Sequence, residues 1–249
     1  MSYLLECCVD CVESALTAQS AGADRLEICA SLITGGITPT LSLFKSISER
    51  CDIKKHVLIR PRFGDLLYTD YEFEIMLDEV RTFKNAGADG VVIGLLTEDG
   101  SVDIERTKRL REAAGELSVT FHRAFDVCRD PFEAAEQISA VGISSILTSG
   151  QENGAQKGAT LIKKLVDLYS DKLNILVGAG VTAENISDIA RQTGVRHFHM
   201  SGKKNCESPM KYRKPGVPMG IESLSEFTII RSDYDQISKA KQALNSLTV

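Results

Sequence analysis

Short apolar runs suited to buried strands alternate along the chain with longer segments that have the three-and-four spacing of amphipathic helices. The first two runs are Leu4–Val9 and Arg25–Cys29, and the helix-favouring segment Val12–Ala21 lies between them. A strand, a helix and a strand imply parallel neighbours joined by a right-handed crossover. Further strands are predicted at His56–Pro61, Ser118–His122 and Leu173–Val177, and in runs that begin at Val91, Ile146 and Phe198.

A glycine recurs where a predicted helix gives way to a strand, as expected for a left-handed helix C-cap. These glycines are Gly22, Gly87, Gly142 and Gly194. The other predicted helices are Thr40–Glu49, Asp70–Asn85, Asp103–Ala114, Pro131–Ala140, Ala159–Tyr169, Ala183–Gln192 and Asp233–Leu247.

Eight strands alternating with helices, without a composition shift that would mark a linker, predict a single-domain (β/α)8 TIM barrel over residues 1–249. A long loop after the eighth strand and a C-terminal helix are expected within residues 203–249. The rival is an open doubly wound sheet, but no Gly-x-Gly-x-x-Gly follows the first strand.

Composition narrows the class of protein. Hydrophobic residues make up 43% of the chain, and the net charge is only -5, which argues against a surface that attracts nucleic acid or anionic lipid. No apolar run approaches the length of a membrane span, and the first strand begins almost at once, so we expect a soluble cytoplasmic protein. The seven cysteines, an odd number, are expected to be reduced thiols.

Polar side chains occupy the ends of several predicted strands, on the face that alternation turns inward. Barrel interiors are usually Val, Ile and Leu, so such charges must pair with one another or bind a ligand. One interpretation is a self-contained network in which Glu6 and Glu27 bridge Arg60 and Arg62; the other is a ligand site. The inward-facing set is Glu6, Cys8, Asp10, Glu27, Cys29, Arg60, Arg62, Thr120, His122, His199 and Ser201.

Among the inward-facing residues, Cys8 and Cys29 are the pair whose chemistry points most specifically to one ligand. Neighbouring strands lie roughly 4.8 Å apart, so two thiols in phase can share one Cu(I) ion, which prefers thiolate ligands. The alternative is that both are small buried hydrophobic residues. The Cys8-x-x-Cys11 spacing is weak evidence for a redox motif without a thioredoxin-like context.

The segment Thr120–Asp126 favours an enzyme as the alternative function. His122 is a candidate general acid or base, with Asp126 either orienting it or bonded to an arginine to hold a loop. Arg60 and Arg62 are expected to clamp an anion, and Glu6 or Glu27 to act as the partner acid or base. Such an isomerase, lyase or hydrolase would act on a small phosphorylated or carboxylated metabolite.

The loops after the seventh and eighth predicted strands are the common phosphate site of this fold. Gly178 and Gly180 lie in the first loop, and Ser201 and Gly202 in the second, so we expect either an anion site or plain glycine turns. The basic segment Lys203–Met219 that follows is predicted to be a solvated loop.

Six motifs together resemble the CutC family of copper homeostasis proteins. They are Glu6–Asp10, Gly22–Cys29, Gly35–Pro39, Ile59–Arg62 with Gly64 and Asp65, Thr120–Asp126, and Leu147–Gly150. The resemblance implies an intracellular TIM barrel, often a homo-oligomer, with a role in copper tolerance or trafficking and Cu(I) bound at Cys8 and Cys29. Phe63 and Cys11 depart from the usual pattern, where glycine and serine are common.

Overall fold

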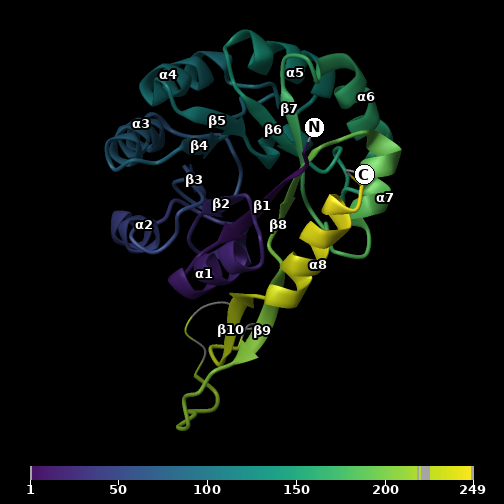
Figure 1. Ribbon diagram of the computed structural model, residues 1–249. Helices are drawn as coiled ribbons and strands as arrows, with labels where there is room; N and C mark the ends of the chain where they lie inside the picture. Colours follow the sequence, from purple (N-terminus) through teal and green to yellow (C-terminus); the bar gives the residue numbers. More distant parts are fainter. Residues whose placement is uncertain (1, 218, 220–224, 248–249) are drawn as a thin grey trace.

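The computed structural model describes residues 2–217, 219 and 225–247. Eight parallel strands close into a barrel in sequence order, with helices on the outside (Figure 1), which confirms the predicted TIM barrel. The strands are β1 Leu4–Val9, β2 Arg25–Ile28, β3 Lys54–Leu58, β4 Gly90–Ile93, β5 Ser118–Phe121, β6 Ser145–Thr148, β7 Asn174–Val177 and β8 His197–Met200.

The helices follow the strands as expected from the sequence. They are α1 Val12–Ser20, α2 Leu41–Ser48, α3 Asp70–Asn85, α4 Ile104–Ala114, α5 Pro131–Ala140, α6 Ala159–Tyr169, α7 Ile186–Thr193 and α8 Tyr234–Asn245, with short 3-10 helices at Leu32–Thr34 and Arg123–Val127. In the described part of the chain, no helix has both the length and the apolar character that a bilayer span requires.

Local chemistry explains where these helices begin and end. Thr69 and Glu72 form a capping box at the start of α3, and the Cys11 Sγ accepts a hydrogen bond from the Ser14 N–H at the start of α1. The junction glycine Gly22 has φ +92° after α1, a conformation that a side chain would strain.

Strand alternation separates an apolar outer face from a polar inner one. On β1, Leu5, Cys7 and Val9 are fully buried in the core cluster beneath the helices. Glu6 and Cys8 take the opposite face, so the strand aims them into the barrel.

A two-stranded sheet replaces part of the predicted loop after β8. The strand β9 (Lys203–Glu207) pairs antiparallel with β10 (Thr228–Ser232), and the pair projects away from the barrel below α8 (Figure 1). The loop prediction for residues 203–207 is therefore wrong. The sequence of β9, Lys-Lys-Asn-Cys-Glu, has no apolar alternation, and its hydrogen bonds depend on partners 21 to 29 residues further along the chain. Pro218, within the same prediction, lies outside the described residues.

Candidate functional site

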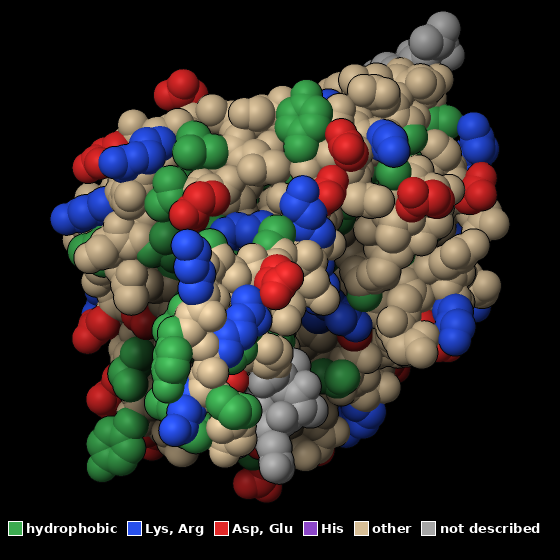
Figure 2. Space-filling model, turned by 90° about the horizontal axis from the view of Figure 1, so that it is seen from below, with side chains coloured by type: hydrophobic (Ala, Val, Ile, Leu, Met, Phe, Trp, Pro, Cys, Tyr) green, Lys and Arg blue, Asp and Glu red, His purple; other side chains and the backbone are tan. Residues whose placement is uncertain are grey.

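A cavity of about 1190 Å³ opens at the C-terminal mouth of the barrel. Its wall takes residues from strand ends and from the loops that follow them, including Cys8, Cys29, Arg60, His122 and His199. The face of the molecule that carries β9 and β10 is hollowed near its centre, between Lys and Arg side chains (Figure 2). Parallel strands therefore deliver polar side chains to one enclosed space, as the fold predicts.

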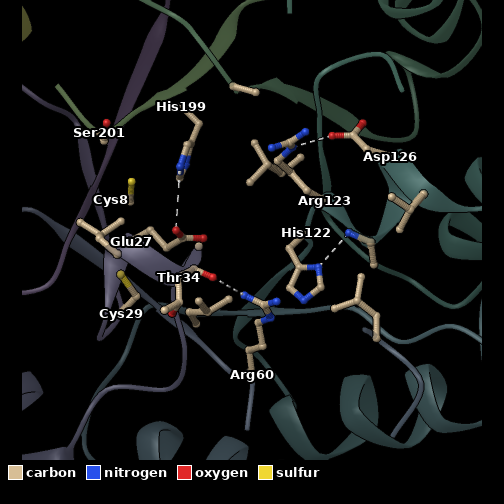
Figure 3. A pocket seen from close by; sticks show the side chains of 18 of the residues that line it. Cys8, Glu27, Cys29, Thr34, Arg60, His122, Arg123, Asp126, His199 and Ser201 are labelled. Carbon is tan, nitrogen blue, oxygen red and sulfur yellow. Dashed lines mark hydrogen bonds and ion pairs between the residues drawn. The ribbon is translucent and has the colours of Figure 1, made fainter. Parts of the chain in front are cut away.

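Cys8, Glu27 and His199 form a cluster of donor atoms in this wall. The register pairs Cys8 with Glu27 across β1 and β2, and β8 lies on the other side of β1 and contributes His199. One ligand atom from each residue lies within 4.8 Å of the other two, and all three side chains are buried. Figure 3 shows Glu27 and His199 facing each other, with Cys8 beside them. The set is a thiol, a carboxylate and an imidazole, which can jointly hold one metal ion.

A second layer of charge supports this cluster from inside the barrel. The His199 Nδ1 lies 2.7 Å from the Glu6 Oε1, and the Arg25 Nε donates to the Glu6 Oε2 at 2.5 Å. Glu6 is only 1% exposed. These contacts fix the plane of the His199 ring and leave its Nε2 toward Glu27, at 3.9 Å.

The interpretation in which Glu6 and Glu27 bridge Arg60 and Arg62 is therefore wrong. Arg25 and His199 pair with Glu6, and His199 lies within ion-pair distance of Glu27. Alternation places Arg25 on the same face of its strand as Glu27, so the period-two pattern carried a signal that the prediction missed.

Burial and ion pairing shift the pKa values of Glu6, Glu27 and His199. Burial alone would raise the pKa of Glu6, but Arg25 and His199 outweigh it and lower the pKa to about 2. Burial raises the pKa of Glu27 to about 7. Burial disfavours the imidazolium of His199, yet Cys8, Glu27 and Glu6 together raise its pKa well above the ordinary value. These shifts favour a carboxylate at Glu6 and the protonated form of the His199 ring beside it.

Cys29 lies two residues beyond the position that faces Cys8. The register sets Glu27, and not Cys29, opposite Cys8, so the expected side-by-side arrangement of the two thiols is replaced by a staggered one. Both cysteines line the cavity, and the Cys29 Sγ donates weakly to the Val9 carbonyl at 3.6 Å. Burial, with Cys8 nearby, raises the pKa of the Cys29 thiol well above its usual value.

The two predicted anion-clamping arginines have different surroundings. Arg60 lines the cavity, where its guanidinium donates to the carbonyls of Gly36 (2.8 Å) and Gly64 (3.1 Å). Arg62 is not part of the cavity wall: it binds Glu72 at 2.5 Å and Asp65 at 2.8 Å, and so holds the loop before α3. Of these two arginines, Arg60 is the one in place to meet a ligand.

His122 and Asp126 have different hydrogen-bond partners in the structure. The His122 Nδ1 accepts the Ala124 N–H at 3.0 Å, whereas Asp126 binds Arg123 at 2.6 Å and the Ser149 N–H at 2.9 Å. Of the two interpretations of Asp126, the loop-holding one matches these contacts. Burial, aided by the charge of Arg60, lowers the pKa of His122 to about 3, so its ring is neutral.

The candidate phosphate loops border the cavity only in part. Gly180, Ser201 and Gly202 line it. Gly178 lies behind the wall, where a Cβ would come within 2.8 Å of the Leu147 side chain. Just beyond this loop, the Thr182 N–H donates to the Asn185 side chain at 2.9 Å.

Comparison with known proteins gives one consistent family. A family model described as the CutC family matches residues 3–204. A family protein CutC from Pasteurella multocida is 43% identical over 96% of this chain and 98% of its own length. Another from Salmonella schwarzengrund is 45% identical, with 96% of each chain covered.

Solved structures agree with this result. A CutC protein from Streptococcus agalactiae, whose name assigns it provisionally to copper homeostasis, is 33% identical with a TM-score of 0.77, over 80% of this chain and 98% of the other. Phosphoribosylanthranilate isomerase from Thermotoga maritima is similar at 14% identity and a TM-score of 0.58, over 99% of this chain and 100% of the other, and that likeness shows the fold alone.

Proposed function

Because this chain belongs to the CutC family, we propose that it takes part in copper homeostasis by binding Cu(I) at the mouth of its barrel. Family membership supports the general role. The cluster of Cys8, Glu27 and His199, with donor atoms within 4.8 Å of one another, is the observation that carries the proposal of a binding site. In this proposal the protein is an intracellular carrier or buffer, as a homo-oligomer, and copper is its cargo.

The chemistry of the donors fits copper. Thiolate and imidazole are the ligands that copper favours among those proteins offer, and both are present in one buried wall. Glu6 hydrogen-bonds the far nitrogen of His199, an arrangement that commonly orients metal-bound histidines. Glu27 adds a carboxylate that Cu(I) does not need, so we assign it a supporting role.

Cys29 supplies the second thiol in this proposal. It lines the same cavity, and burial, with Cys8 nearby, raises the pKa of its thiol. Copper binding requires deprotonated thiols, so an ion bound at this site would replace the protons of both cysteines.

The test is an anaerobic titration of the reduced protein with Cu(I) against a competing chelator. We expect one ion bound in the wild type, and at least a hundredfold weaker binding after Cys8→Ser. Cys29→Ser or His199→Gln should weaken it at least tenfold. The matched control is Cys206→Ser, since Cys206 is a free thiol of β9 that does not line the cavity.

Unchanged affinity in Cys8→Ser would overturn the proposal. So would an equal loss in Cys206→Ser, because it would reveal binding to any accessible thiol. Near-ultraviolet circular dichroism of each variant before titration establishes that the barrel is folded.

A further inference from the structure

Arg60 holds a positive charge in the cavity wall without a carboxylate within ion-pair distance among the described residues. Its guanidinium donates to the backbone carbonyls of Gly36 and Gly64, and weakly to Thr34 at 3.5 Å. Its Nε is buried and has no acceptor in the described part of the protein. Carbonyl contacts position the group but leave its charge uncompensated, so the site favours an anion.

His122 places a second unused donor in the same wall. Its Nδ1 accepts the Ala124 N–H, so the neutral ring carries its proton on Nε2. The residue is 7% exposed, and the Nε2 has no partner among the residues that the structure describes. A buried donor without an acceptor carries an uncompensated desolvation cost, which a bound acceptor removes.

The Arg60 guanidinium and the His122 ring lie close to each other in the cavity wall. The Arg60 charge is close enough to depress the pKa of His122, and Figure 3 shows the guanidinium beside the imidazole ring. Two donor groups in the cavity wall therefore lie together without an acceptor among the described residues.

We propose that Arg60 and His122 bind an anionic oxygen of a small organic ligand, either a carboxylate or a phosphate group, inside the barrel mouth. One oxygen between the donors satisfies the hydrogen bonds, and its charge pairs with Arg60. The cavity of about 1190 Å³ is far larger than one metal ion needs and is of the size that holds an organic molecule.

The rest of the cavity matches such a ligand. Leu58, Leu66 and Leu96 give the wall near Arg60 an apolar surface, and the Cys8–Glu27–His199 cluster forms another part of the same wall. An organic acid can thus place its anionic group at Arg60 and its body against the leucines. This site does not require copper, so the two proposals fail independently.

The experiment measures thermal stabilisation and calorimetric binding with inorganic phosphate, malonate and succinate as separate probes, at constant ionic strength set with chloride. We expect saturable binding of at least one probe, and the comparison decides between phosphate and carboxylate. His122→Asn retains an acceptor for the Ala124 N–H but removes the Nε2 donor, and Arg60→Lys retains the charge but removes the Nε donor. Each variant should weaken binding at least tenfold.

Two controls separate this site from general electrostatic attraction. Arg62→Lys alters an arginine on the same loop that is paired outside the cavity wall, and it should change affinity less than twofold. Cys8→Ser should also leave anion binding intact while weakening copper binding. Equal affinity in wild type, Arg60→Lys and His122→Asn would show an adventitious ion only and would overturn the proposal, as would the absence of saturable binding of all three probes.

A second measurement uses the wild-type protein alone, so its result does not depend on whether the variants fold. In wild-type protein labelled with ¹⁵N-histidine, the His122 Nε2 resonance should shift on addition of the bound probe, because its N–H gains a charged acceptor. An unchanged resonance at saturating probe would place the anion elsewhere and overturn the assignment.

Discussion

His56 is an imidazole buried inside the barrel because its neighbour on the next strand is glycine. It is 2% exposed, and a Cβ on Gly90 would come within 2.5 Å of its Nε2. Burial, with the nearby charge of Arg25, lowers the pKa of His56 to about 4, so the ring is neutral at pH 7. Its folded-state pKa is thus below the ordinary value of about 6.5.

The pH dependence of stability follows from that shift. Between pH 6.5 and 4 the unfolded chain binds a proton at His56 that the folded protein does not, so stability falls as the pH falls through this window. We expect a loss of a few kcal/mol at most from this residue. Urea unfolding at several pH values should show a shallower dependence in His56→Gln than in wild type, and parallel curves would contradict this assignment.

The N-terminus of α3 is the element whose start is best defined by local contacts. The Thr69 Oγ1 accepts the Glu72 N–H at 3.2 Å, and the Glu72 carboxylate accepts the Thr69 N–H at 2.8 Å. Glu72 also binds Arg62, so the cap ties the helix to the loop that leads from β3.

Removal of this cap should therefore cost stability without changing the fold. Thr69→Ala is expected to lower the free energy of unfolding by about 1 kcal/mol, whereas Thr69→Ser should retain most of it. Thr82→Ala, the same substitution at an exposed interior position of α3, is the matched control and should have no cost. Chemical denaturation measures all three, and an equal loss at both threonines would contradict a capping role.

The C-terminal helix α8 completes the outer ring of the molecule. It packs against α1 and α7, and Ile237, Ala240 and Leu244 are fully buried. Lys241 binds Asp24 at 2.6 Å, and Asp24 in turn accepts the Leu5 N–H at the start of β1. Contacts between the two ends of the chain thus close the barrel's outer layer, as Figure 1 shows for α8 beside α7.

A substitution that creates a cavity beneath α8 should lower the free energy of unfolding of the whole barrel. Ile237 contacts the closely packed Gly202 after β8, and Ile237→Ala should lower the free energy of unfolding by about 2–5 kcal/mol. Lys239→Ala, at an exposed position of the same helix, should change it by less than about 0.5 kcal/mol. Urea unfolding followed by circular dichroism measures both, and a small effect of Ile237→Ala would mean that α8 docks only loosely.

The sequence by itself determined the order of strands and helices and the inward face of each strand. These properties arise from local periodicity and from glycine at helix ends, as at Gly22, and such signals need no knowledge of distant residues. They also sufficed for the family resemblance and for the expectation that Cys8, Cys29, Arg60 and His122 meet at one mouth, where they all line the cavity.

Only the tertiary structure decided which of these side chains are partners. The stagger between β1, β2 and β8 sets Cys8 against Glu27 and brings Glu6 to both Arg25 and His199. Strand register is a property of the closed barrel, and residues 6 and 199 are too far apart in sequence for any local pattern to link them. For the same reason the β9–β10 pairing and the different roles of Arg60 and Arg62 emerge only when the loops are in place.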